Sequence, residues 1–515
     1  MSIISLNFFI FFFVIMLIYY ILPGKFQWMW LLLVSVYYYS YHTTIAQTII
    51  FILFILVNWC SSVYGSAKDS IRKKVYVSTL IFDILFLSIF KYSAFIFSIL
   101  EAIGLSRFRA VFDNFSTNIA VYEPPHISYF ALIVIGYLTD VYWDKYKPQK
   151  NPCKLLLFCG YFPIMTSGPI VRYKQLEGQL WNKEKTRFDY ERLVRGLERI
   201  IWGIFKKLVI SQRCSVIVNT IYENYQIYSG FYIIIGVMTY AFQIYTDFSG
   251  LIDMVLGFSE CLGIYLPENF DAPFFSRSIS EFWRRWHITL GAFLKDYVLF
   301  SLQRGRSYKK LRDFCKKHLG KDYKKKYNVP VYFTMLISWF IIGLWHGGGW
   351  NYIFGVGLYM WLIIILSDML QPLFAKIVKI LHINTECESY HLFQQIRTFF
   401  VYIWGLSFFR ASSLKEGFEL WKSAFSSFNP WIFFDESIYK LGLDRREMSI
   451  MGVGLIIVLV VSYISDKKKM DIRDWLRKQN YVFRLAIYVA IFIVTIIYGK
   501  YGQVYDAADF IYGRF

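Results

Sequence analysis

Two histidines are the side chains best suited to catalysis in this sequence. His346 stands in the stretch LWHGGGW, residues 344–350, at the end of the apolar run 333–345. An ionisable group within a membrane span is costly and is by default a functional-site candidate. A neutral imidazole suits a general base, because its unperturbed pKa lies near working pH. The glycines 347–349 permit positive φ and close approach of a ligand; a histidine that merely ends a helix is the alternative.

His287 lies in the densest polar segment of otherwise apolar sequence, residues 265–297. Ser278 and Glu281 have the S-x-x-E spacing of a capping box, which predicts that a helix begins there. Helical spacing continues along an apolar face formed by Phe282, Trp286, Leu290, Phe293 and Tyr297. Gly291 lies one turn from His287 on a different face, so the glycine leaves room beside the ring for a substrate or another helix.

Basic residues accompany His287 on the same predicted helix. Arg284 and Arg285 precede it, and Lys295 lies two turns beyond it. The simplest interpretation is an amphipathic helix in the membrane interface, with the arginines on lipid phosphates.

A third cluster places Gln243, Asp247, Ser249 and Asp253 in the apolar run 241–257. The two aspartates are six residues apart, so they do not share a face of a regular helix, and Gly250 between them is a candidate for a break. These side chains are expected to line a polar tunnel, to bind a cation or to hydrogen-bond helix ends.

Other chemistries lack their motifs. There is no phosphate-cradling glycine loop, no H-E-x-x-H and no G-x-S-x-G, which argues against a built-in NTPase, a metalloprotease and an α/β-hydrolase. The seven cysteines are scattered without a C-x-x-C pair, so neither a disulfide framework nor a metal site is expected.

The elements that position these residues are apolar helices. The chain of 515 residues is 56% hydrophobic and only 18% charged, and apolar runs cover 3–22, 29–41, 48–60 and 75–100. About 20 apolar residues cross a bilayer as a helix, and backbone hydrogen bonding favours helical bundles there. The sequence predicts an all-α polytopic transmembrane bundle of about 11–13 helices. The first run lacks a basic n-region and is followed by further spans, so it is expected to be retained.

Interruptions and charges predict how these helices are arranged. Pro163, Gly168 and Pro169 favour a broken or re-entrant helix within 155–173, and the charged segment 174–212 fits an interfacial helix. The net charge of +20 is concentrated in clusters between apolar runs, which predicts cytoplasmic basic loops on anionic lipid and no nucleic-acid partner. Three spans before the cluster at Arg72 place the N-terminus outside the cell.

Four stretches together resemble the membrane-bound O-acyltransferase (MBOAT) family, in the bacterial branch of the alginate O-acetylation protein. They are FPIMTSGPIVRY (162–173), the long motif 241–298 that contains EFWRRWHITLG, GLWHGGGWNYIFGVGL (343–358) and LSFFRASSLKEGFELW (406–421). The resemblance implies one MBOAT membrane domain over 1–515, with N-terminal helices in 1–150, a catalytic core in 155–421 and C-terminal helices in 445–515. It also implies a multi-pass protein of the bacterial plasma membrane.

The same resemblance implies acyl transfer, usually of acetyl, from a cytoplasmic thioester to a hydroxyl, ending on a glycan outside the cell. His346 corresponds to the family's proposed catalytic histidine and His287 to its second functional position. His346 would deprotonate the acceptor or a relay group, while His287 positions the thioester or stabilises the oxyanion. Trp345 and Gly347 are expected to line the substrate tunnel with the polar residues of 241–257.

The expected donor is acetyl-CoA or another acyl thioester, without a metal. Arg284, Arg285 and Lys295 would hold the coenzyme A phosphates. The expected partners are the lipid bilayer, an extracytoplasmic polysaccharide and a secreted or membrane-anchored acetyltransferase.

Departures from the family pattern bear on the acceptor and the partner. LFSLQRGRSYKK (299–310) replaces a P-L-G-G stretch, a basic insert occupies 304–326, and Tyr359 and Met360 replace a second H-G. D-alanyl transfer to teichoic acid is therefore one alternative, although the stretch 406–421 favours acetylation. A glycan or lipid transporter with His346 as a proton relay is the alternative from another class.

Overall fold

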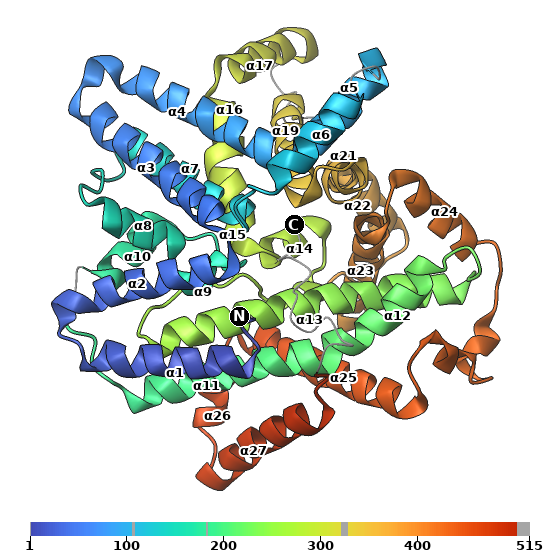
Figure 1. Ribbon diagram of the computed structural model, residues 1–515. Coiled ribbons are helices and arrows are strands. Elements are labelled where there is room, and N and C mark those ends of the chain that lie inside the picture. The colour runs from blue at the N-terminus through green and yellow to red at the C-terminus, as the bar shows by residue number, and fades with distance from the viewer. Residues whose placement is uncertain (1, 106–108, 182–183, 321–327, 502–515) are drawn as a thin grey trace. The chain divides into compact units, whose positions relative to one another are not determined.

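The computed structural model describes residues 2–105, 109–181, 184–320 and 328–501 (Figure 1). Across these ranges the chain is helical without a β-strand, and a single isolated β-bridge joins Phe270 to Trp286. The prediction of an all-α fold is confirmed.

Six of the described helical segments are long and apolar enough to cross a membrane. They are α3 (Ile45–Ala67), α13 (Phe231–Cys261), α19 (Val329–Gly347), the segment Trp350–Met369, α25 (Arg445–Lys468) and α27 (Tyr481–Tyr498). α4 (Asp69–Phe90) and the segment Ser93–Leu105 would add a seventh span, bent by 79°. The chain is therefore a multi-pass membrane protein, as predicted.

Helices form over all four apolar runs of the first hundred residues, but the fourth run, 75–100, is divided between α4 and the segment Ser93–Leu105. α1 (Leu6–Ile21) has only 16 residues, shorter than the roughly 20 that cross a bilayer, and α2 (Gly24–His42) is not among the helices that pass on length and apolarity. α3 and α4 pack side by side, together with α7 (Ile127–Tyr142).

The described chain forms two compact units. The first comprises the described parts of Met1–Lys207, Asp247–Pro267 and Leu485–Phe515, and the second those of Leu208–Thr246 and Glu268–Arg484. α13 contributes its C-terminal half to the first unit and its N-terminal half to the second.

The first unit contains the predicted broken helix. α8 (Pro152–Gly160) begins at the N-cap Asn151, and α9 (Phe162–Met165) follows after one residue. Gly168 then donates its amide to the Ile164 carbonyl at 2.9 Å, and a Cβ on it would lie 2.4 Å from the Ile164 Cα. The break is therefore confirmed, and the tight turn after α9 requires glycine.

Reciprocal glycines bring α11 (Tyr190–Ile204) against α13 in the first unit. A Cβ on Gly203 would lie 2.5 Å from the Gly250 carbonyl oxygen, and one on Gly257 would lie 2.6 Å from the Gly196 oxygen. The pairing of 196 with 257 and of 203 with 250 means that the two helices run antiparallel. The predicted break at Gly250 is wrong: α13 continues through it, and the missing side chain permits close helix packing.

The second unit carries both histidines. Between the start of this unit and α19, its helices include α12 (Gln212–Glu223), α14 (Ile279–Arg285), α15 (Ile288–Phe293), η5 (Leu294–Leu299), α16 (Phe300–Arg304) and α17 (Arg306–Leu319). After α19 come α20 (Trp350–Tyr352), η6 (Ile353–Leu358), α21 (Tyr359–Met369), α22 (Gln371–Ile380), α23 (Glu388–Arg410), α24 (Leu414–Ala424), α25 and α26 (Ile472–Arg477). α19 packs on η6, and η6 packs on α23, where a Cβ on Gly355 would meet the Gly405 oxygen at 2.5 Å.

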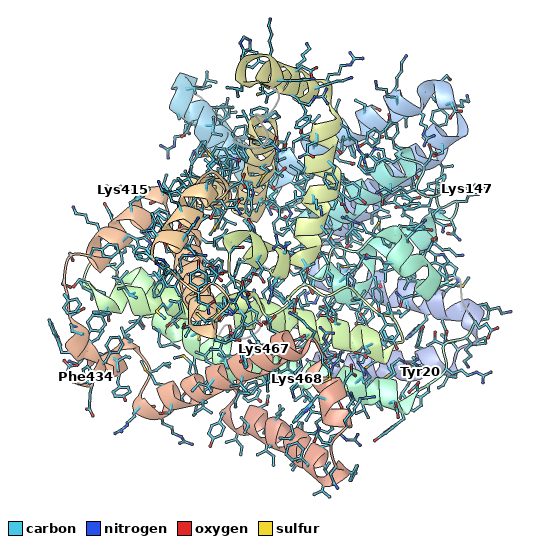
Figure 2. All side chains as sticks on the ribbon, turned by 180° about the vertical axis from the view of Figure 1, so that it is seen from behind. Tyr20, Lys147, Lys415, Phe434, Lys467 and Lys468 are labelled. Carbon is cyan, nitrogen blue, oxygen red and sulfur yellow. The ribbon has the colours of Figure 1, made fainter. Side chains whose placement is uncertain are left out.

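Basic side chains gather where helices end, as the charge pattern predicts. Lys467 and Lys468 stand exposed at the C-terminal end of α25 (Figure 2). Phe434, in the segment between α24 and α25, is 87% exposed. Such ends suit an interfacial zone, where lysine and aromatic residues are both stable.

Candidate active site

His346 lies in the last turn of α19, where a left-handed glycine ends the helix. Gly348 has φ 63° and ψ 36°, and its amide donates to the Leu344 carbonyl at 3.1 Å. Glycine adopts this conformation without steric cost. The expected positive φ among the three glycines is thus confirmed at Gly348.

The space beside the other two glycines is filled by the protein itself. A Cβ on Gly347 would lie 2.5 Å from the Tyr352 ring, and one on Gly349 would lie 2.5 Å from Asn351 Oδ1. The expectation that these glycines leave room for a ligand is therefore not met there: their smallness lets α20 fold back against the end of α19.

Aromatic rings enclose the His346 side chain, which is only 3% exposed. Its ring centroid lies 5.1 Å from that of Phe409 on α23 and 4.9 Å from that of Trp345. Asn351 fastens the turn by donating from Nδ2 to the Ala411 carbonyl at 2.9 Å. His346 is thus held where α19, α20 and the end of α23 meet.

His287 occupies a kink between α14 and α15, with φ 48° and ψ 51°. The predicted start at Ser278 is confirmed, because its side chain accepts the Glu281 amide at 3.2 Å. A single helix to residue 297 is wrong, because α14 ends at Arg285 and Trp286 is extended. A left-handed non-glycine residue costs about 1–3 kcal/mol and persists only where its surroundings fix it.

A short antiparallel pairing fixes this kink. It consists of the bridge between Phe270 and Trp286, with Asp271 donating its amide to the Arg285 carbonyl at 3.0 Å. Beyond His287, Ile288 donates to the Asn269 carbonyl at 3.1 Å. The segment 269–271 therefore holds the chain on both sides of His287.

Burial keeps the His287 imidazole neutral. The side chain is almost fully buried and lies outside the candidate spans. Desolvation of the charged form lowers its pKa to about 3. Near neutral pH the ring therefore carries one N–H donor and one acceptor nitrogen.

The Trp345 ring packs against the rings of both histidines. It contacts the His346 ring and also lies 5.8 Å, between centroids, from the His287 ring. His287 and His346, 59 positions apart in the sequence, thus lie beside one buried indole. Gly347 is exposed, and the tunnel roles of Trp345 and Gly347 stay predictions.

The three basic residues expected to hold phosphates differ in their surroundings. Arg284 and Lys295 are exposed, and the Lys295 ammonium lies 5.6 Å from the Phe300 ring centroid. Arg285 instead pairs with Glu281 at 2.6 Å and with Asp466 at 2.7 Å. A phosphate on Arg285 would have to displace a carboxylate, so Arg284 and Lys295 suit the prediction better.

The carboxylates of α13 pair with cations of α11 and η3 (Phe205–Ser211), within the first unit. Lys207 contacts Asp247 at 2.5 Å, with both side chains buried. Asp253 contacts Lys206 at 2.5 Å and Arg199 at 3.0 Å. These aspartates are paired with the protein's own cations, and their predicted tunnel role stays a prediction.

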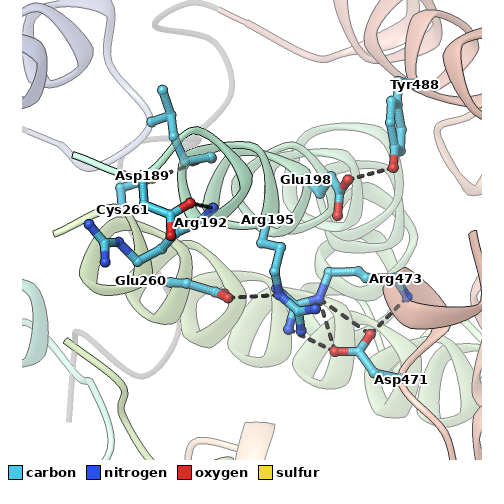
Figure 3. Close-up of polar contacts among 10 residues, drawn as sticks. Asp189, Arg192, Arg195, Glu198, Glu260, Cys261, Asp471, Arg473 and Tyr488 are labelled. Carbon is cyan, nitrogen blue, oxygen red and sulfur yellow. Dashed lines mark hydrogen bonds and ion pairs between the residues drawn. The ribbon is translucent and has the colours of Figure 1, made fainter. Parts of the chain in front are cut away.

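Further contacts extend this set of pairs. Lys206 also donates to the Ser249 hydroxyl at 2.8 Å, while Gln243, in the second unit, is buried. Figure 3 shows Arg195 on Glu260, at 3.1 Å, and Glu198 accepting from the Tyr488 hydroxyl at 2.5 Å. The predicted interfacial helix over 174–212 is therefore wrong at its C-terminal end, where the lysines are buried against α13.

Asn269 is a residue of this site that the sequence reasoning missed. It is fully buried, and its Oδ1 accepts both the amide and the hydroxyl of Thr289, at 3.0 and 2.7 Å. The available signal was its place in the polar segment 265–297, eighteen residues before His287.

Comparisons with known proteins identify relatives of the chain. The model of the MBOAT, membrane-bound O-acyltransferase family, matches residues 31–314, more than half of the chain, including His287 but not His346. The chain is 28% identical to the peptidoglycan O-acetyltransferase of Helicobacter pylori over 63% of its own length and 61% of that protein. It is 26% identical to the probable alginate O-acetylase AlgI of Pseudomonas aeruginosa over 89% of its length and 80% of that protein.

A third relative is the teichoic acid D-alanyltransferase of Bacillus subtilis, 30% identical over 46% of this chain and 59% of that protein. All three names describe the transfer of an acyl group. The chain belongs to the membrane-bound O-acyltransferase family and falls in the enzyme class of O-acyltransferases.

Proposed function

We propose that the protein moves an acyl group, acetyl in the first instance, from a cytoplasmic thioester towards hydroxyls of an extracytoplasmic polysaccharide. The observation that carries the proposal is the pair of buried histidines whose rings both lie beside Trp345. The relatives named for O-acetylation of peptidoglycan and alginate support acetyl as the group.

His346 is the general base of the proposed reaction. Its imidazole takes the proton of the acceptor hydroxyl, whose oxygen attacks the thioester carbonyl carbon. The C–S bond then breaks, and the leaving thiolate takes the proton back from the imidazolium. The aromatic wall of Trp345 and Phe409 excludes water, which strengthens each charge interaction in the site.

His287 lies beside the same indole, that of Trp345. As a neutral imidazole it donates one hydrogen bond to the thioester and stabilises charge that develops on it. Arg284 and Lys295, both exposed, attract the phosphates of the donor, for which acetyl-CoA is the first candidate.

The test uses purified protein in proteoliposomes with acetyl-CoA labelled in the acetyl group and a soluble acceptor glycan. We expect His346→Ala to lower transfer by about 10²–10⁴-fold, as loss of a general base does. His318→Ala, on the exposed surface of α17, is the matched control and should transfer normally. Normal transfer by a well-expressed His346→Ala protein would remove His346 from the mechanism.

D-alanyl transfer to teichoic acid is the second candidate, favoured by the 30% identity to the Bacillus subtilis relative. The same proteoliposomes distinguish the two when they are supplied with a D-alanyl carrier-protein thioester. His346-dependent transfer from that donor, and none from acetyl-CoA, would replace the acetyl assignment.

A secreted or membrane-anchored acetyltransferase is the proposed partner that completes delivery to the glycan. Membership of an acyltransferase family supports an enzyme over the transporter alternative. Co-purification from membranes after mild crosslinking tests the partner, and recovery of the chain without an acetyltransferase would count against it.

A further inference from the structure

Asn269 stands directly beside the kink that holds His287. The bridge between Phe270 and Trp286 sets the register of the antiparallel pairing, which places Asn269 opposite His287. The Asn269 carbonyl accepts the amide of the residue that follows the histidine, Ile288, at 3.1 Å. Asn269 is thus the nearest neighbour of His287 across this pairing.

Chemistry fixes which way the Asn269 amide is turned. A backbone N–H can only donate, so the side-chain atom 3.0 Å from the Thr289 nitrogen must be the oxygen Oδ1. The Thr289 hydroxyl donates to the same oxygen at 2.7 Å. The NH₂ group therefore occupies the other branch of the amide.

The Oδ1 atom of Asn269 acts as a helix cap. His287 occupies the N-cap position of α15, where a side-chain oxygen usually accepts the amide of the second helical residue. Asn269 supplies that oxygen from another segment, to Thr289. The cap of α15 is therefore supplied by Asn269 and not by the His287 side chain.

The nitrogen end has no hydrogen-bond partner in the described part of the chain. Asn269 is 0% exposed, and a buried donor left unsatisfied loses the full free energy of its hydration. Buried polar groups are normally paired. A donor kept in this state beside a candidate catalytic residue points to a ligand that supplies the acceptor.

We propose that Asn269 is a further catalytic residue, whose Nδ2 donates a hydrogen bond to the acyl carbonyl oxygen of the thioester. The inference rests on the proposed function. When the acceptor oxygen forms its bond to the carbonyl carbon, the acceptor proton passes to His346 and the carbonyl π electrons move onto oxygen. The Asn269 N–H stabilises this oxyanion. The electrons then return, the C–S bond breaks, and the thiolate takes the proton from His346.

Asn269→Asp separates the two ends of the side chain. It keeps an oxygen for Thr289 but has no NH₂ group. We expect kcat to fall about 10²–10³-fold, as loss of one oxyanion donor does, with KM for the donor changed less than about threefold. Asn224→Asp, at the exposed end of α12, makes the same change outside the site and should leave kcat unchanged. An Asn269→Asp protein with wild-type kcat would overturn the proposal.

Infrared spectroscopy measures a quantity that a purely structural role of Asn269 would leave unchanged. In a His346→Ala protein, which binds without turnover, an acetyl thioester with ¹³C at the carbonyl should show a band shifted to lower wavenumber than in solution. Adding Asn269→Asp should remove most of this shift. If that protein does not reach the membrane, Asn269→Ser keeps a neutral oxygen for Thr289 and is measured instead.

The outcomes separate the two hypotheses. A bound carbonyl band that is the same with and without Asn269 overturns the role of Asn269 and leaves the proposed function standing. Failure of both the wild-type and the His346→Ala protein to bind the thioester overturns the proposed function, and this inference with it.

Discussion

At the scale of residues, two left-handed backbone positions orient the two histidines. Gly348 turns the chain directly after His346 at no steric cost, whereas His287 itself adopts the left-handed conformation. The second arrangement is the more expensive one, and the hydrogen bonds to segment 269–271 hold it in place. Substituting His287 is therefore expected to change the cost of a left-handed residue, whereas substituting His346 does not alter that cost.

Acidification should test the burial of His287. Its pKa is lowered from 6.5 to about 3 in the folded protein, so between these values the unfolded chain binds a proton that the folded chain does not. Stability therefore rises with pH across this window and is lost as pH falls below 6.5. Between pH 6.5 and 4.5 the loss from this residue is about 2–3 kcal/mol, at 1.36 kcal/mol per unit.

His287→Gln provides the comparison, because glutamine does not titrate. We expect unfolding in detergent, followed by intrinsic fluorescence, to depend less on pH in His287→Gln than in the wild type over this window. Parallel curves for the two proteins would mean that His287 is solvated and protonates normally.

Residue-level expectations succeeded where the signal was local. Ser278 caps α14 as its spacing predicts, and Gly348 has the positive φ expected among the three glycines. The kink at His287 could not be predicted from helical spacing, because the partners that create it are Asn269 and Asp271 in an extended segment. The same applies to Gly347 and Gly349, where Tyr352 and Asn351 use the space.

At the scale of elements, the contact between α11 and α13 depends on glycine. Gly203→Ala should be destabilising, because its Cβ would lie 2.5 Å from the Gly250 carbonyl oxygen. Relieving this contact requires the backbone of α11 or α13 to shift, which costs free energy. Among the described residues, the Cβ of Gly178→Ala, inside α10 (Tyr173–Leu180), meets nothing within 4 Å. That variant should gain about 0.4–1 kcal/mol from the lower entropy of the unfolded chain.

Thermal unfolding of the two variants in the same detergent checks this contrast. The midpoint should fall for Gly203→Ala and rise slightly for Gly178→Ala. A rise in both would show that α11 and α13 can separate without cost.

The Lys207–Asp247 pair should show the energetics of a buried salt bridge. Lys207→Met leaves Asp247 charged and buried, which costs about 3–5 kcal/mol. Adding Asp247→Leu removes the uncompensated charge, so the double variant should recover most of the loss. A double-mutant cycle on unfolding free energies measures the coupling; additive effects would mean that the two groups are solvated.

Charged helices were harder to predict than apolar ones. Segment 174–212 has the periodicity of an interfacial helix, yet Lys206 and Lys207 are buried because α13 supplies Asp247 and Asp253 at matching heights. Sequence patterns report which residues are polar along one helix. They do not report the residues of a second helix that neutralise them.

At the scale of the whole molecule, the positive residues predict the topology. The clusters at Arg72 and along α17 are expected in the cytoplasm, with the N-terminus outside. In a protein without its native cysteines, Ser2→Cys should react with an impermeant maleimide in intact cells. Lys309→Cys, exposed on α17, should react only after lysis. The opposite pattern would invert the topology.

The multi-pass all-α class followed from composition and run length alone, because the membrane leaves few alternatives. The sequence predicted less well which helices are long enough to span the membrane, because α1 has only 16 residues. Local signals set these boundaries: the Ser5 side chain caps the start of α1, and Pro23 keeps Leu22 extended at its end.

The ion pairs between α11 and α13 also constrain how the protein is made. Lys207 emerges from the ribosome 40 residues before its partner Asp247, and Arg195 precedes Glu260 by 65. Cations without counter-charges are disfavoured in lipid, so we expect α11 and η3 to stay at the aqueous boundary until α13 has been translated. We therefore expect the order of synthesis to be part of the folding pathway.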